Sequence, residues 1–325
     1  MVSGPVQAVA PGKVNLCFRV GPLREDGYHS VASLYAAVDQ LETVQLELDP
    51  QRPAGSVGCE LRVVAGSLVA QREAAGAFDP TLVPLDERNL AIRAAQAVLA
   101  EAPDLPSGLM LRIAKAVPVA GGMGGGSADA AAALSAAAEL IARETGHAIA
   151  RERLLEIGAG LGADVPFAMT GGAAVGTGSG TELRAVPVRV RWHGVLVADT
   201  GALSTPEVFA TLDRMRAEGA APTVRESELE VPAGLLRALA EGESAVGGEA
   251  LANDLQAPAL QMSPELRRRL DELEELDARA MVSGSGPTIV ALPRTSGHDD
   301  GAESSRVLAA QLRERGLCAV ACTIG

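Results

Sequence analysis

Aromatic side chains and long apolar runs are scarce in this 325-residue chain. It contains four Phe, two Tyr and one Trp, so alanine, valine and leucine must fill its interior. No apolar run approaches the roughly 20 residues that cross a membrane. Residues 1–5 also lack the basic and apolar regions of a signal peptide. We therefore expect a cytoplasmic protein without a membrane partner.

Positive charge is also in short supply. The net charge is −13, which disfavours binding to nucleic acid. A small anionic ligand therefore needs a local positive site. Of the 28 basic residues only two are lysines, Lys13 and Lys115, and both lie beside segments that contain proline and glycine. Their position makes them candidates for such a site.

Metal-binding patterns are missing as well. The four cysteines are dispersed except for Cys318 and Cys322, and that spacing lacks a second pair with which to hold zinc. Reduced cysteines are the expected state in the cytoplasm. The four histidines are equally dispersed, which argues against a histidine metal site.

Strand-like and helix-like segments are interleaved along the chain, which indicates α+β or α/β layers. Residues 6–20 predict two short strands that are broken at Pro11-Gly12, and residues 43–48 alternate as in a half-buried strand. A change of composition near residue 175 suggests a division into domains 1–175 and 176–325. Helices are predicted over 89–102, 127–143, 151–161, 205–217, 231–240, 249–260, 264–276 and 304–315.

Residues 118–128 (PVAGGMGGGSA) hold the strongest functional signal. Five of the six residues 121–126 are glycine, so backbone N–H groups can approach a ligand closely. The loop lies between an apolar strand, 109–113, and an alanine-rich helix. This setting favours phosphate binding at a helix N-terminus over a flexible linker. The loop has neither the Lys-Ser/Thr of a Walker A motif nor the spacing of a dinucleotide fingerprint.

Asp164 lies in the segment Gly-Ala-Asp-Val-Pro, and two interpretations are open. It is either a helix N-cap with Pro166 in the first turn or a carboxylate that removes a proton from a hydroxyl.

Two further segments each allow two interpretations. Residues 283–287 (SGSGP) form either a hairpin turn or a second wall around a polyphosphate. Tyr28 and His29 form either a surface turn or a pair that stacks on and hydrogen-bonds to a base or sugar.

The order of these motifs resembles the GHMP kinases, the family of galactokinase, homoserine kinase, mevalonate kinase and phosphomevalonate kinase. The resemblance implies an α+β fold with a ribosomal S5 domain 2-like N-terminal domain, a ferredoxin-like C-terminal domain and an active site in the cleft between them. The matching segments are 10–15, 26–29, 87–90, 118–131, 164–167 and 283–287.

The resemblance also implies a reaction, the transfer of the γ-phosphoryl group of ATP to an alcohol with Mg²⁺ present. Asp164 would be the catalytic base, assisted by Lys13, and Ser127 would lie near or bind the Mg²⁺. Asn15, Tyr28 and His29 would contact the acceptor. The ATP-binding residues would be Asn89, Lys115, Pro118, Val119, Ala120, Gly121, Gly122, Met123, Gly124, Gly125, Gly126, Ser127 and Ala128.

Within the family, the motifs are most similar to those of the kinase that acts on a cytidine diphosphate-linked methylerythritol in the non-mevalonate isoprenoid pathway. The alternatives are a kinase of the homoserine or mevalonate type, or a non-catalytic member that binds a nucleotide or sugar. The chain departs from the family pattern at Met123, where leucine is common. It also departs at Ala128, which replaces the second serine of a Ser-Ser pair. A monomer or a homodimer is expected.

Overall fold

The computed structural model describes residues 4–102, 105–198, 201–241, 251–294 and 301–325. By their internal contacts the residues form two compact units. Two long strands, β1 (Val6–Leu23) and β2 (His29–Asp49), run from one unit into the other. Unit 1 comprises Met1–Gly12, Gln40–Val119 and Gly124–Gly171, and unit 2 comprises Lys13–Asp39, Ala120–Met123 and Gly172–Gly325.

The predicted break at Pro11-Gly12 is wrong, because β1 continues through it. Glycine is needed at position 12 for close packing and not for a turn. A Cβ atom at this position would lie 3.0 Å from Cγ2 of Val117, and the carbonyl oxygen of Gln40 is 3.4 Å away. The strand therefore lies against the residues that lead into the glycine loop.

Unit 1 contains a small mixed sheet. The second half of β2 pairs antiparallel with β4 (Gly108–Lys115), with Thr43 opposite Ala114, and β4 pairs in parallel with β3 (Val57–Val63). The register brings the end of β4 beside residues 42–43 of β2. The helices of this unit are α1 (Leu68–Ala74), α2 (Leu90–Leu99), α3 (Gly125–Thr145), α4 (Arg151–Leu161) and α5 (Val165–Thr170), with a 3₁₀ turn at Pro80–Leu82.

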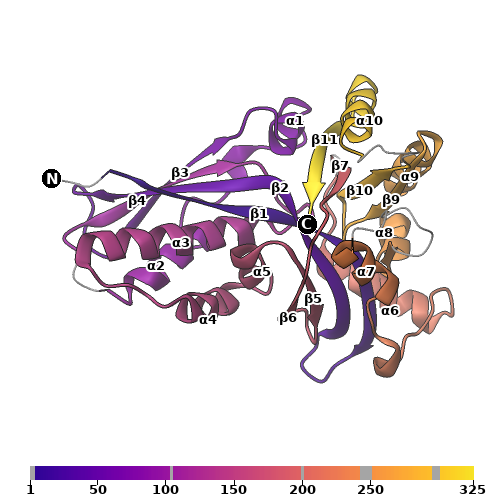
Figure 1. Cartoon of the computed structure of the whole chain (residues 1–325), viewed down its shortest axis with the longest axis horizontal. Helices are drawn as coiled ribbons and strands as arrows, with labels where there is room; N and C mark the ends of the chain where they lie inside the picture. The colour runs from indigo at the N-terminus through magenta and orange to yellow at the C-terminus, as the bar shows by residue number, and fades with distance from the viewer. Residues whose placement is uncertain (1–3, 103–104, 199–200, 242–250, 295–300) are drawn as a thin grey trace. The chain divides into compact units, whose positions relative to one another are not determined.

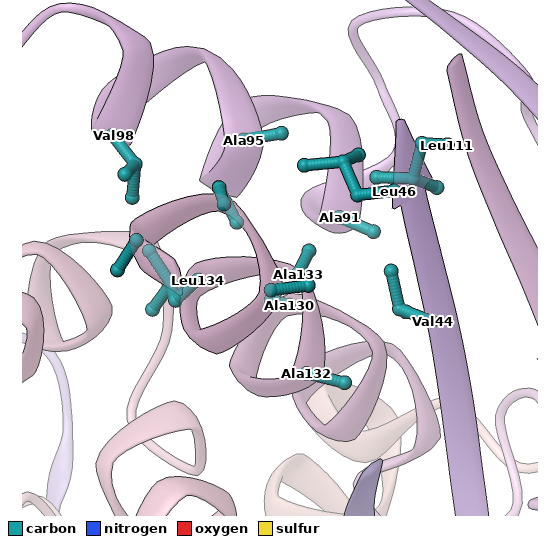
Figure 2. Close-up of a cluster of buried hydrophobic side chains, with 14 of the residues drawn as sticks. Val44, Leu46, Ala91, Ala95, Val98, Leu111, Ala130, Ala132, Ala133 and Leu134 are labelled. Atoms are coloured by element: carbon teal, nitrogen blue, oxygen red, sulfur yellow. The ribbon is translucent and has the colours of Figure 1, made fainter. Parts of the chain in front are cut away.

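Small side chains set the packing of α3 in this unit. In Figure 1, α2, α3 and α4 lie together next to the strands. Figure 2 shows alanines of α2 and α3 facing one another, while Val44, Leu46 and Leu111 reach in from the strands. Alanine also has the highest helix propensity, so the same residues favour the helix and allow a close approach. The facing alanines labelled in Figure 2 are Ala91, Ala95, Ala130 and Ala133.

Unit 2 contains an antiparallel sheet in the order β11-β7-β10-β9. Its strands are β7 (Trp192–Ala198), β9 (Ala278–Val282), β10 (Ile289–Pro293) and β11 (Cys318–Ile324). The first half of β2 pairs with β5 (Ala173–Thr177), which pairs with β6 (Glu182–Val186), and β8 (Ala252–Asn253) pairs with β1. The helices are α6 (Thr205–Ala217), α7 (Ala233–Glu241), α8 (Gln256–Met262), α9 (Pro264–Glu275) and α10 (Ala302–Glu314), with a 3₁₀ turn at Glu226–Glu228.

The predicted division at residue 175 lies close to the passage from unit 1 to unit 2 between Gly171 and Gly172. The units are not continuous in sequence, however, because β1 and β2 contribute residues 13–39 to unit 2. None of the helices in the described part of the chain is both long enough and apolar enough to cross a membrane. All four cysteines are free thiols.

Candidate functional site

The glycine loop opens directly into α3. The helix starts at Gly125, two residues before the predicted start, and its N-cap is Gly124, with a φ of 67° and no side chain that caps the helix. The N–H of Ala128 makes the first bond of the helix, to the carbonyl of Gly124. The N–H groups of the first turn therefore lack a partner within the helix and are available to an anion.

Only glycine fits at Gly122. Its φ is 74°, and a Cβ atom there would lie 2.9 Å from the carbonyl oxygen of Ser283 and 3.0 Å from that of Gly286. Residues 283–287 therefore touch the glycine loop within unit 2. The turn is held from behind by Asn253, whose Nδ2 donates to the carbonyls of Val282 and Gly284 at 2.7 Å each.

Lys13 lies on β1 in unit 2 and is tied to the glycine loop. Its backbone N–H donates to the carbonyl of Met123 at 3.0 Å. Its ammonium donates to Oδ1 of Asn15 at 2.9 Å and lies 5.5 Å from the ring centroid of Tyr35. The side chain of Lys13 is thus oriented by Asn15 and by the face of an aromatic ring.

Asn15 is completely buried and links several parts of unit 2. Its Nδ2 donates to Oγ of Ser33 at 2.7 Å, and its backbone N–H donates to Oγ of Ser283 at 3.0 Å. Ser33 donates in turn to the carbonyl of Cys17. These bonds, with that from Lys13, fix the amide in one orientation.

Asp164 lies in unit 1 at the start of α5. Pro166 is in the first turn, as the helix-cap interpretation requires, but the carboxylate makes no capping hydrogen bond. The preceding turn adjoins the glycine loop, because a Cβ atom on Gly162 would lie 3.9 Å from Oγ of Ser127. The structure therefore brings the segment 162–164 beside the first turn of α3 and does not support a capping role for the side chain.

Lys115 is buried at the end of β4, with its side chain 1% exposed. Its ammonium lies between two carboxylates, 2.6 Å from Oε1 of Glu42 and 2.5 Å from Oδ2 of Asp129. Glu42 also accepts the N–H groups of Ala116, at 2.9 Å, and Val117, at 3.2 Å. We call Glu42, Lys115 and Asp129 the buried ionic cluster. Neither carboxylate was predicted as a site residue. Asp129 lies in the matching segment 118–131 but was given no role, and Glu42 carries no local signal in the sequence.

Burial dominates the electrostatics of this cluster. Burial, followed by the charge of Asp129, raises the pKa of Glu42 to about 7, although Lys115 opposes the shift. Burial also raises the pKa of Asp129, against the attraction of Lys115. Burial alone would lower the pKa of Lys115, but the two carboxylates outweigh it and raise that pKa. Protonation of one carboxyl leaves a neutral ion pair, so the cluster holds a proton up to near neutral pH.

Asn89 begins α2, and its side chain forms a helix cap. Its Oδ1 accepts the N–H of Ala91 at 2.9 Å, and its Nδ2 donates to the carbonyl of Pro84 at 2.8 Å. The next residue reaches the glycine loop, because Cδ1 of Leu90 would lie 3.8 Å from a Cβ atom on Gly126. Asn89 thus positions the start of α2 beside that of α3.

Tyr28 and His29 belong to unit 2 and differ in exposure. Tyr28 is 67% exposed, whereas His29 is buried and stacks on Phe209 of α6 with ring centroids 5.1 Å apart. Nε2 of His29 lies 2.9 Å from Oδ1 of Asp213. The sequence pair was predicted, but Phe209 and Asp213 were not, because only the fold brings α6 to this loop.

Metal ligands are sparse. The described residues contain no group of three or more His, Cys, Asp or Glu side chains that could hold a metal ion. Within the same part of the chain, the hydroxyl of Ser127 makes no hydrogen bond. It stands in the first turn of α3 and is open to a phosphate or to a hydrated cation.

Comparison with protein families matches the chain in both halves. The family described as "GHMP kinases N terminal domain" matches residues 89–172, and "GHMP kinases C terminal" matches residues 235–312. The first match contains the glycine loop and Asp164, and the second contains residues 283–287.

Individual proteins extend the similarity to nearly the whole chain. A 4-diphosphocytidyl-2-C-methyl-D-erythritol kinase of Leifsonia xyli is 44% identical over 88% of this chain and 87% of its own length. A protein of the same name from an Arthrobacter species is 44% identical over 97% and 91%. The crystal structure of a 4-(cytidine 5'-diphospho)-2C-methyl-D-erythritol kinase matches with a TM-score of 0.71 and 29% identity, over 98% of this chain and 99% of its own.

The raised pKa of Glu42 predicts a pH dependence of stability. The folded protein binds this proton more tightly than the unfolded chain does, so the free energy of unfolding falls as pH rises from 4.5 to about 7. We expect Glu42→Gln to flatten this part of the curve, measured by urea denaturation at a series of pH values. Glu47→Gln, on the same strand but paired with Arg112 at the surface, should keep the slope of the wild type. Equal slopes for wild type and Glu42→Gln would contradict the assignment.

Proposed function

The chain belongs to the GHMP kinases, and we propose that it transfers the γ-phosphoryl group of ATP to the 2-hydroxyl of 4-diphosphocytidyl-2-C-methyl-D-erythritol. The predicted family and its α+β fold are confirmed by the family matches and by the solved structure. The relatives that share 44% of its residues carry the name of this kinase. The enzyme is accordingly a phosphotransferase with an alcohol as acceptor.

The observation that carries the proposal is the uncapped first turn of α3 behind the glycine loop. Phosphoryl transfer depends on positioning and on stabilisation of charge more than on covalent chemistry by the protein. Backbone N–H groups from the loop and from the first turn would hold the ATP phosphates. Residues 118–128 are the proposed phosphate-binding segment, and the start of α2 at Asn89 supports it from the side.

Mg²⁺ fits this site through the ATP phosphates, as expected where the protein offers few carboxylate ligands. The hydroxyl of Ser127 is the proposed protein contact, since it is open and stands in the first turn of α3. The ion would supply neutralisation of phosphate charge.

Asp164 is the proposed base that takes the proton of the acceptor hydroxyl, and Lys13 is the proposed cation that stabilises the resulting negative charge. Each residue is held in its own unit. The turn before Asp164 adjoins the phosphate loop, and Asn15 orients the ammonium of Lys13.

His29, Phe209 and Tyr28 are the proposed contacts of the cytidine. A bound base would extend the stack that His29 and Phe209 form, and the exposed ring of Tyr28 provides a third flat surface. Asp213 holds the imidazole in place. Asn15, which is buried, is proposed to act on the acceptor chiefly through Lys13.

A panel of acceptors tests the proposed substrate. We expect release of ADP from ATP and Mg²⁺ in the presence of 4-diphosphocytidyl-2-C-methyl-D-erythritol and only background release with homoserine or mevalonate. A coupled ADP assay measures this, with each acceptor omitted in turn as control. Turnover with homoserine or mevalonate in place of the cytidine compound would overturn the proposal.

Asp164→Asn tests the base. The amide keeps the size of the side chain but cannot accept the proton, so turnover should fall at least ~100-fold. The affinity for ATP, measured by calorimetry, should stay within a few fold. Asp79→Asn, at another helix start in unit 1, serves as control and should keep full activity. An unchanged rate in Asp164→Asn would assign the residue a structural role.

Phe209→Ala tests the cytidine contact. Loss of a ring that stacks on a base costs about 1–3 kcal/mol, which corresponds to a rise of roughly 5- to 150-fold in the KM for the acceptor. The KM for ATP should stay constant, and Phe209→Tyr should restore most of the affinity. A KM for the acceptor that is unaffected by loss of the ring would exclude Phe209 from the site.

A further inference from the structure

We propose that the buried ionic cluster of Glu42, Lys115 and Asp129 positions the phosphate loop, and that Lys115 acts on ATP through the loop. The proposal rests on the proposed function of residues 118–128 as the ATP site. The cluster joins three elements, because Glu42 is on β2, Lys115 ends β4 and Asp129 is in the second turn of α3.

Glu42 fixes the start of the loop. Its Oε1 accepts from the ammonium of Lys115 and from the N–H of Val117, while its Oε2 accepts the N–H of Ala116. One buried carboxylate therefore binds three consecutive residues at the point where β4 ends. Pro118 follows directly, so the direction in which the chain enters the loop is set by these bonds.

Lys115 connects this start to the far end of the loop. Its ammonium donates to Oδ2 of Asp129 at 2.5 Å. The ammonium also packs against the first residue of α3, because a Cβ atom on Gly125 would lie 3.2 Å from Nζ. The same Cβ atom would lie 3.1 Å from the carbonyl oxygen of Val117. The two ends of the loop, at Val117 and Gly125, are thus held together by one ammonium and two carboxylates.

The burial of Lys115 separates this role from direct contact with ATP. The side chain is 1% exposed, and both of its carboxylate partners are buried as well. An ammonium in this position would have to leave two ion pairs to reach a phosphate. Removing either carboxylate takes away one of the two acceptors that hold the ammonium in place, so the position of Lys115 depends on both.

Asp129→Ala tests the link to α3. We expect the KM for ATP to rise between about 10- and 100-fold, the effect of a small displacement of binding groups, while kcat and the KM for the acceptor stay within about two-fold. Asp129→Asn should rescue binding, because its amide oxygen still accepts from Lys115. Arg112→Met is the matched control. Arg112 is on the same strand as Lys115 and bridges Glu47 and Glu60 at the surface. Its loss should therefore leave the KM for ATP unchanged.

Direct binding of ATP by Lys115 predicts a different result for Asp129→Ala. If Lys115 binds ATP directly, Asp129→Ala releases its ammonium, and the affinity for ATP should stay equal or increase. Calorimetry with ATP alone measures this without any acceptor. Glu42→Gln is a second variant of nearly equal size that loses an acceptor for the N–H of Ala116. It should weaken ATP binding too. Unchanged binding in either folded variant overturns the proposal.

Gly124→Val separates this proposal from the proposed function. A valine at a φ of 67° strains the loop itself, so ATP binding should be lost if residues 118–128 form the ATP site. Normal binding in Gly124→Val would refute the site, and with it the positioning role. Loss of binding in Gly124→Val together with normal binding in Asp129→Ala would refute the positioning role alone.

Discussion

The proposed site depends on one constraint: to bind a phosphate, the first turn of α3 must offer unpaired N–H groups and still keep a fixed position. A side-chain cap at Gly124 would occupy those groups. A Cβ atom at Gly122 would collide with the carbonyl oxygen of Ser283 at 2.9 Å, and one at Gly125 would crowd that of Val117 at 3.1 Å. Glycine solves both problems but contributes no contacts of its own. The rigidity must therefore come from the surroundings, which here are the alanine interface of α2 and α3 and the buried ionic cluster.

Much of this arrangement could be predicted from the sequence. The glycine loop, the alanine-rich helix and Asp164 are local patterns, so their spacing alone indicates a phosphate site and a carboxylate beside a proline. The same local rules failed at Pro11-Gly12, because the glycine there is required by packing against Val117 and not by a turn. Glu42, Asp213 and Phe209 carry no local signal. They became visible only when strand register and helix packing brought them to Lys115 and His29.

The scarcity of lysine takes on a different meaning with the structure in hand. The net charge of −13 requires a local positive field for an anionic ligand, and the two lysines were its predicted source. Lys13 remains the proposed source of positive charge, and its ammonium donates to Asn15. Lys115 does not supply free charge, since two carboxylates surround it. In the proposed function, the positive potential at the phosphate loop would therefore come mainly from backbone dipoles, from Lys13 and from the Mg²⁺ that accompanies ATP.

A buried ionic cluster is a costly way to brace a loop, since well-packed apolar residues often stabilise a fold as well or better. Apolar contacts, however, have no fixed direction, whereas the carboxylate of Glu42 accepts from Lys115, Ala116 and Val117 along defined lines. A phosphate loop needs that directionality, because a displacement of about 1 Å is enough to impair binding and transfer. The raised pKa of Glu42 is the visible part of this cost. Ionisation of Glu42 lowers the free energy of unfolding toward neutral pH. The same carboxylate and its partner Lys115 nevertheless hold the two ends of the loop together.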